Sequence, residues 1–448
     1  MSGIRDRSFV RWLAIIAVTA LAFRVAAAFW YDAHTQVGFD GAWYLEIARF
    51  VAKGIGFREP TFYLILHKRV ATAAHPPLYP LFLSAVDFLG LHTVLAHRLW
   101  SCLPGTLTVV FVGITARDLA GRRAGIIAAG CAAVSISLAA QDVILWSGGF
   151  FGMTISLVVL LSYRYLRRPR PIGALVVTAA VTASVLTRAE SALLYLILII
   201  PLVTITVKSV RTRARVLFAS ALTAAMLLSP WTIYNAGRFD HPVVLSTGLG
   251  GLLGHSNCPA AYDGPLVGSW VGGCAKGLPR RLPADESSAD LLLREAAFQY
   301  AGDHLDRLPV VLAARLLRTF GIWDARYQFR HDLYLDAANL RWVSNIAVVQ
   351  YWVYVALGAV GFIALRRRRQ QLLPIVAPII TVVVITVAGH GALRFRIGFD
   401  AVVPILVGVG AVTLLDRRRS GHSARLHGFS TMEGDPAPEA SRQPATDT

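Results

Sequence analysis

The sequence predicts an all-α polytopic membrane protein with about ten transmembrane helices. First, 55% of the 448 residues are hydrophobic and 16% are charged, which leaves too little polar surface for a soluble protein of this length. Second, the apolar residues gather into runs of about 17–22 residues, the length that spans a bilayer. Third, short arginine clusters separate these runs, as expected for loops on the cytoplasmic side.

The first apolar run, residues 10–31, follows three arginines at positions 5, 7 and 11. We interpret it as a retained first helix, because it is too long for the apolar core of a signal peptide. No small-residue cleavage site precedes Asp32 either. The arginines behind the run predict that this helix enters the membrane from the cytoplasm.

Nine further spans follow, and their order places every short basic cluster on one side of the membrane. The predicted spans are 98–117, 124–141, 148–166, 172–188, 191–207, 214–232, 345–365, 372–388 and 400–415. Two long polar segments, 32–97 and 233–343, then face outward, together with the short "GHGALRFRIGFD". Residues 1–415 therefore form one transmembrane domain. Residues 416–448 are polar and lack an apolar period, which predicts a disordered cytoplasmic tail.

The net charge of +18 does not indicate nucleic-acid binding, because the arginines lie between apolar runs and no basic soluble domain is present. No internal repeat of fixed period is found. This counts against the repeated halves that are common in secondary transporters.

Two of the four cysteines lie in the second outward segment, in "HSNCPAAYDGPLVGSWVGGCA". An outward compartment permits disulfides, so we predict a bridge between Cys258 and Cys274, with two free thiols as the alternative. Closing a loop of this length stabilises by about 3 kcal/mol in the chain-entropy model. Cys102 and Cys131 lie inside predicted spans as small core residues, and no Cys/His spacing resembles a zinc site.

The stretch "GFDGAWYLEIARFVAKGIGF" (38–57) directly follows the first span. Asp40 stands at the position of a helix N-cap and Gly54 at that of a C′ glycine. Apolar residues such as Trp43 and Ile47 recur between them at helical spacing, with charged residues on the other face. This pattern predicts an interfacial helix on the outer leaflet. Asp40 is then either a simple cap or a functional acid.

The segment "TAAHPPLYPLFLSAVDFLG" ends the first outward segment. Pro76 and Pro77 predict a stiff, extended entry behind His75. The apolar helix that follows, 78–89, is short for a span and is predicted to be half-embedded. His75 is either a functional residue at the outer rim or a histidine satisfied in a turn.

Further charges stand where lipid disfavours them. Asp142 ends the third span, Arg188 ends the fifth, and Arg394 and Arg396 lie in the last outer turn. Such a charge costs a few kcal/mol in lipid, so it usually faces a cavity or a partner. Arg24 in the first span joins this group, with snorkelling to the headgroups as its alternative.

The topology sends these charges to one face of the membrane. Asp40 and Asp142 suit the roles of general base and acceptor orienter. The planar fork of arginine suits a phosphate. A base beside a phosphate clamp fits sugar transfer from a lipid-phosphate donor in the bilayer to an acceptor from outside.

The ordered set of motifs resembles the GT-C membrane glycosyltransferases, in particular the protein O-mannosyltransferase and aminoarabinose-transferase-like group. The resemblance covers most of 1–415. It rests on "GFDGAWYLEIA", "HPPLYP", "LAGRRAGIIAAG", "LTRAE", "SPWTIYN" and "RFRIGF" in this order. It implies a GT-C-like fold, a polyprenyl-phosphate-sugar donor and inverting transfer.

The resemblance also implies residue roles. Asp40 corresponds to the catalytic base of the first loop and Asp142 to the acid of the second outer loop. The donor phosphate would be bound by Arg188, Arg394, Arg396 and His75. The sequence departs from the mannosyltransferases in two places: Gly41 follows Asp40 where they have a second acid, and Leu78–Tyr79–Pro80 follows the proline pair where they continue toward a lysine. Lys68 and Arg69 stay open as substitutes for that lysine.

We therefore predict a bacterial inner-membrane glycosyltransferase with an outward-facing site. It would move a sugar from a polyprenyl-phosphate donor to a protein, lipid or cell-envelope glycan. The alternatives are a transporter or flippase of a lipid-linked glycan and a non-catalytic assembly protein. No cofactor and no metal signature are predicted, although two acids leave room for a loosely held divalent cation.

Overall fold

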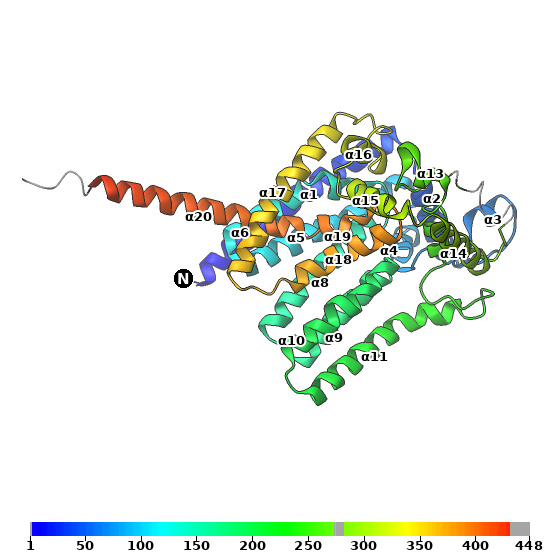
Figure 1. Cartoon of the computed structure of the whole chain (residues 1–448), viewed down its shortest axis with the longest axis horizontal. Helices are drawn as coiled ribbons and strands as arrows, with labels where there is room; N and C mark the ends of the chain where they lie inside the picture. Colours follow the sequence, from blue (N-terminus) through cyan, green and yellow to red (C-terminus); the bar gives the residue numbers. More distant parts are fainter. Residues whose placement is uncertain (1, 273, 275–281, 431–448) are drawn as a thin grey trace, which may run out of the picture.

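In the computed structural model, residues 2–272, 274 and 282–430 are described. The long helices lie side by side along the longest axis of the molecule (Figure 1). The two outward segments of the sequence gather at one end of this bundle. The N-terminus and the end of the last helix lie at the other end, where the loops with the arginine clusters also lie (Figure 1).

The ten predicted spans are confirmed as helical elements. Seven helical segments in the described part of the chain are long and apolar enough to cross a membrane alone. Five of them are single helices: α1 (Ser2–His34, of which Arg7–His34 is the span), α5 (Val94–Ala120), α8 (Gly148–Arg167), α11 (Val210–Asn235) and α17 (Val343–Arg367). The sixth, Ala189–Thr206, is built from η1 (Ala189–Ala192), η2 (Tyr195–Ile199) and α10 (Ile200–Thr206). The seventh, Ile397–Arg418, joins α19 (Ile397–Asp400) to the first part of α20 (Val403–Ser430).

The other three predicted spans differ in form. Residues 124–141 correspond to two helices, α6 (Arg122–Ala133) and α7 (Ile136–Val143), which meet at a bend of 50°. The fifth and ninth spans are the shorter apolar helices α9 (Pro171–Val185) and α18 (Leu373–Ala388).

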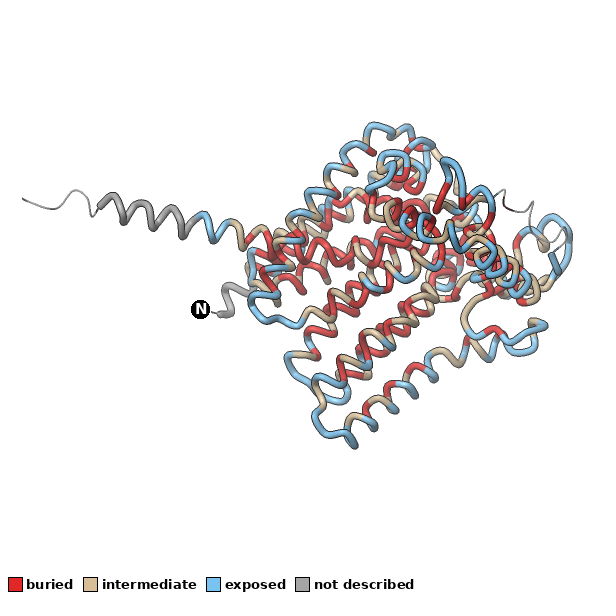
Figure 2. The backbone as a smooth tube through the Cα atoms, viewed as in Figure 1, coloured by how far each residue is buried: buried red, intermediate tan, exposed pale blue. Residues whose placement is uncertain are grey.

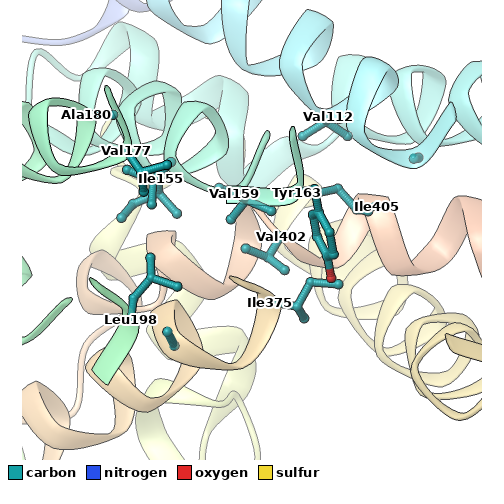
Figure 3. Close-up of a cluster of buried hydrophobic side chains, with 14 of the residues drawn as sticks. Val112, Ile155, Val159, Tyr163, Val177, Ala180, Leu198, Ile375, Val402 and Ile405 are labelled. Atoms are coloured by element: carbon teal, nitrogen blue, oxygen red, sulfur yellow. The ribbon is translucent and has the colours of Figure 1, made fainter. Parts of the chain in front are cut away.

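The core of the bundle lies among α5, α8, α9, α18 and α20, whose valines and isoleucines interdigitate (Figure 3). Glycines bring α17 and α20 into close contact. A Cβ at Gly361 or Gly410 would collide with the backbone of the facing helix, which is how small residues draw membrane helices together. By contrast, α11 keeps exposed residues along much of its length (Figure 2), including Phe218 and Met226, as expected for a lipid-facing helix.

The first outward segment contains three helices, α2 (Phe39–Ala52), α3 (Pro60–Leu64) and α4 (Leu78–Phe88). The second contains α12 (Gly248–Gly254), α13 (Pro259–Tyr262), η3 (Gly264–Leu266), α14 (Glu286–Asp303), α15 (Leu308–Thr319) and α16 (Ala325–Asp332). A disulfide joins Cys258 and Cys274 in the second segment, and both cysteines pack with α13 and α15 in a small apolar cluster.

Two details differ from the expectations. Asp40 is not the N-cap of α2, because the extended Gly38 takes that position and the Asp40 side chain turns to another partner. Gly54 does follow the helix with φ +71°, a conformation that suits glycine. The last helix, α20, continues to Ser430 and thus enters the tail expected to be disordered, since its basic residues are good helix formers. Residues 431–448 lie outside the described residues.

Candidate functional site

The site is built around an ion pair between the first outward segment and the last outer turn. Arg394 Nη1 donates to Asp40 Oδ2 at 2.8 Å, although the two residues are 354 positions apart. Both side chains stay accessible, with exposed fractions of 26% and 28%. Asp40 lies in the first turn of α2, and Arg394 lies in η5 (Leu393–Phe395). A substrate can therefore reach both charges.

Arg188 lies next to this pair. Its Nη1 donates to the main-chain oxygen of Arg394 at 3.2 Å, and its Nε donates to Glu190 Oε1 at 2.6 Å. Its guanidinium also lies over the rings of Phe151 and Phe395, with distances of 5.3 and 5.5 Å to the ring centroids. These contacts hold a second arginine beside Arg394, as a bound phosphate would require.

His75 lies on the same side of the molecule, against α2. Its ring centroid is 5.0 Å from that of Trp43 and 4.9 Å from that of Tyr44. Burial lowers the pKa of His75 below its ordinary value. The imidazole is therefore neutral near pH 7, and it offers a hydrogen bond to a ligand but no positive charge. The main chain just after it is held near Arg188, because Leu78 N donates to Leu186 O at 2.9 Å.

Three aromatic residues complete the surroundings, and the sequence interpretation missed them. Trp146 follows α7, and its ring lies 5.7 Å from the guanidinium of Arg394 and 5.6 Å from the ring of Tyr334. Tyr44 donates to Ser147 Oγ at 3.3 Å, and burial raises the pKa of Tyr44, which therefore stays neutral. Trp146 stands in "ILWSGG", four positions after Asp142, and this proximity to a charged residue is its only mark in the sequence. No sequence pattern marks Tyr334, because only the tertiary fold brings it to the site.

The loop that carries Arg394 is held by the second outward segment. Three successive amides are fixed by main-chain or side-chain oxygens of that segment. Gly391 N donates to Gly268 O at 2.7 Å, Ala392 N to Thr319 Oγ1 at 3.0 Å and Leu393 N to Asp332 Oδ2 at 2.6 Å. The long outer segment thus positions the arginine of the site.

Two further buried basic residues, His390 and Arg315, lie in or beside this loop. His390 is 3% exposed, and its pKa is lowered well below the ordinary value by burial and then by Arg394, Arg315 and Arg188. Arg315 is buried and donates to main-chain oxygens and to Asn257 Oδ1. No carboxylate pairs with Arg315 among the described residues. Arg315 thus adds a positive charge without a carboxylate partner beside this loop, whereas Arg394 pairs with Asp40 and Arg188 with Glu190.

Asp142 does not lie in this group, which corrects the expectation of an outer-rim acid. It is 1% exposed and accepts from Arg24 Nε at 2.7 Å. Arg24 also donates to Ala132 O and Ala133 O, the carbonyls that end α6. The bend between α6 and α7 is the physical reason: the acid is directed into the bundle, where Arg24 meets it. Arg24 therefore does not snorkel.

Arg396 is also placed elsewhere, although it stands two positions after Arg394. Its side chain is fully buried, its Nε donates to Asp400 Oδ1 at 2.9 Å, and it stacks on the ring of Tyr351 at 3.9 Å. The tight turn of η5 directs Arg394 and Arg396 to different partners. The expected role of Arg396 in phosphate binding is not supported by this geometry.

Comparisons with known proteins agree with this architecture. Residues 74–234 match the family model of the dolichyl-phosphate-mannose-protein mannosyltransferases. Two structures of the Archaeoglobus fulgidus oligosaccharyltransferase are 13% identical to the chain, with TM-scores of 0.52 for the apo form and 0.53 for the form tethered to an acceptor peptide with the NVT sequon. They align over 95% and 93% of this chain and over 52% and 51% of their own.

The chain has the GT-C fold. It spans about half the length of the archaeal oligosaccharyltransferase structures it matches. ArnT from Cupriavidus metallidurans bound to undecaprenyl phosphate is 17% identical and aligns over 90% of this chain and 77% of that one, with a TM-score of 0.43. No curated protein matches the chain in sequence. Within this GT-C chain, the family model covers His75 and Arg188 but neither Asp40 nor Arg394.

The carboxylates of the candidate site do not form a ready metal site. In the described part of the chain, no group of three His, Cys, Asp or Glu residues lies close enough to hold a metal ion. Asp40 is engaged by Arg394 and Glu190 by Arg188. The arrangement is suited to acid–base chemistry beside a bound anion.

Proposed function

We propose that the chain is a membrane glycosyltransferase that moves a sugar from a polyprenyl-phosphate donor to an acceptor on the outer face of a bacterial inner membrane. The acceptor class is a hydroxyl-bearing protein, lipid or cell-envelope glycan. The observation that carries the proposal is the accessible Asp40–Arg394 pair beside Arg188. The family-model match and the GT-C fold give it support.

In the proposed reaction, Asp40 takes the proton of the acceptor hydroxyl. The acceptor oxygen forms a bond to the anomeric carbon of the sugar, and the bond from that carbon to the phosphate oxygen breaks. The electron pair leaves with the polyprenyl phosphate, whose added charge Arg394 and Arg188 neutralise. Since attack and departure occur on opposite faces of the sugar, the anomeric configuration inverts. Arg394 and Asp40 are in direct contact in the structure, so this ion pair must open before the sugar can lie between the two groups.

The proposed orientation follows from charge. The site lies at one end of the bundle, and the arginine-bearing loops lie at the other end, which the positive-inside rule assigns to the cytoplasm (Figure 1). Reporter fusions at Gly264 and Ser420 should therefore report opposite compartments. The same compartment for both would contradict the orientation and leave the chemistry untouched.

The function is tested with purified protein in vesicles, radiolabelled polyprenyl-phosphate sugars and cell-envelope acceptor fractions. We expect label in the acceptor together with stoichiometric release of polyprenyl phosphate. Asp40→Asn should abolish most of this transfer. Glu46→Gln is the matched control, because Glu46 lies on the same helix and pairs with Arg49. Movement of intact donor across the membrane without cleavage would identify a flippase and end the proposal.

A further inference from the structure

A groove lies at the face of the membrane domain opposite the candidate site, between the end of α8 and the start of α9. It has a volume of about 200 Å³ and is lined by Leu161, Arg164, Arg168, Arg170, Ile172 and Val176, among others. Helix α8 begins at Gly148, next to Trp146 and Ser147 of the site, and has 20 residues. It rises by about 30 Å, so the groove and the site lie at opposite surfaces of the bilayer.

The groove carries uncompensated positive charge. Four arginines stand in the last turn of α8 and in the loop that follows it, and one of them, Arg167, pairs with Asp118 at 3.5 Å. Arg164, Arg168 and Arg170 are exposed and have no carboxylate partner in the part of the chain that the structure describes. These three arginines therefore line one opening without a carboxylate that neutralises them, so their guanidinium groups are available to a phosphate.

The wall of the groove is apolar and faces lipid. Ile172 and Val176 stand one turn apart on α9 with exposed fractions of 63% and 43%. The guanidinium groups thus lie at headgroup depth and the apolar wall extends from them into the hydrocarbon layer. This combination matches a phospholipid, with its charged head and acyl chain, better than a nucleotide or a free phosphate.

The shape of the groove is fixed by packing. A Cβ at Gly173 would stand 2.8 Å from the ring of Tyr165, so glycine permits the close contact between the two helices there. The hydroxyl of Tyr165 and Thr206 Oγ1 are hydrogen-bonded at 2.7 Å, which anchors the ring to α10. The groove therefore exists before a ligand arrives.

We propose that this groove is a binding site for an anionic phospholipid of the leaflet opposite the candidate site. The headgroup phosphate binds Arg164, Arg168 and Arg170, and an acyl chain lies along Ile172 and Val176. Basic pockets between membrane helices on the positive side bind anionic headgroups by this combination of charge and shape. The proposal is independent of the catalytic role of the other face.

The test is native mass spectrometry of the full chain with phosphatidylglycerol or phosphatidylcholine. We expect the wild type to retain phosphatidylglycerol preferentially, and Arg168→Gln with Arg170→Gln to weaken this binding by about tenfold or more. The matched control is Arg367→Gln with Arg368→Gln. Those two arginines stand at the exposed C-terminal end of α17 and do not line the groove. The control should retain the lipid within about twofold.

Two further arms separate the sources of binding. Val176→Trp keeps all three arginines but fills the apolar wall, so it should also weaken phosphatidylglycerol binding. Inorganic phosphate at millimolar concentration should not displace the lipid. Equal losses in both double variants would reduce the groove to a general basic surface and overturn the proposal. If inorganic phosphate displaced phosphatidylglycerol and Val176→Trp still bound this lipid normally, the arginines would form a site for a free anion. This result would also overturn the proposal.

Discussion

The molecule contains two acid–arginine pairs of nearly equal length in very different surroundings. Asp40 and Arg394 are 2.8 Å apart and about a quarter exposed. Asp142 and Arg24 are 2.7 Å apart and almost fully buried. The first pair joins two outer loops, and the second closes the bend between α6 and α7. The length of an ion pair alone does not reveal its function. A catalytic acid must be accessible to a substrate, whereas a structural acid can be fully buried.

The substitution Asp40→Asn should separate the accessible pair from the buried pair by the largest effect. Asn keeps an acceptor oxygen for Arg394 but cannot take a proton from an acceptor hydroxyl. We expect turnover to fall by about 10²–10⁴, with an unchanged melting temperature in detergent. Asp142→Asn should do the reverse and lower the melting temperature more than the turnover per folded molecule. Near-normal turnover in Asp40→Asn would remove Asp40 from the mechanism.

The second effect concerns stability. Arg24→Ala leaves Asp142 buried without its partner and also frees the carbonyls of Ala132 and Ala133. We expect a loss of about 3–5 kcal/mol in the free energy of unfolding. Arg394→Ala, at the accessible pair, should cost less than about 1 kcal/mol. Denaturant unfolding of both variants measures the difference, and equal losses would mean that burial does not separate the two pairs.

The third effect concerns binding of the donor. Arg394→Ala should weaken the affinity for polyprenyl phosphate by about 10–150-fold, since a charge-assisted hydrogen bond contributes about 1.5–3 kcal/mol. Arg49→Ala is the control, because Arg49 lies on α2 and pairs with Glu46 away from the site. Fluorescence titration with polyprenyl phosphate measures both, and comparable affinities would show that Arg394 does not hold the phosphate.

The smallest effect concerns how Arg394 is positioned. Asp332 accepts from Leu393 N and from Gln328 Nε2. Asp332→Ala leaves that buried amide without its acceptor, at a cost of about 1–3 kcal/mol. We expect Asp332→Ala to raise the KM for the donor. Asp332→Asn retains an acceptor oxygen, so its KM should stay close to that of the wild type. A stability loss with an unchanged KM would make Asp332 a structural residue only.

The sequence predicted the helices well because long apolar runs have few alternatives in a bilayer. It also predicted that Asp40, His75, Arg188 and Arg394 lie at one end, because topology alone decides this. The sequence could not show whether the side chains of Asp142 and Arg396 point toward the candidate site. A bend of 50° and a tight turn decide which way those side chains point, and both arise from packing between distant segments.

Other residues of the site could not be predicted from the sequence either, because packing between distant segments also decides their positions. Asp332, Thr319 and Tyr334 stand in the second outward segment, where the helical periodicity does not show which residues meet the last outer turn. Their contribution depends on contacts with residues more than fifty positions away, such as Leu393 N. Such contacts leave no local pattern in a single chain.

The buried Arg24–Asp142 pair sets a problem of timing during synthesis. Arg24 lies in the first span, and its partner is 118 residues later. At about 5–20 residues per second, the ribosome needs about 6–24 s to supply the acid. During this interval the first helix carries a lone charge whose membrane insertion costs about 2.5–3.5 kcal/mol. Until α7 emerges, the guanidinium of Arg24 lacks its carboxylate partner inside the membrane, so the order of translation becomes part of the assembly pathway.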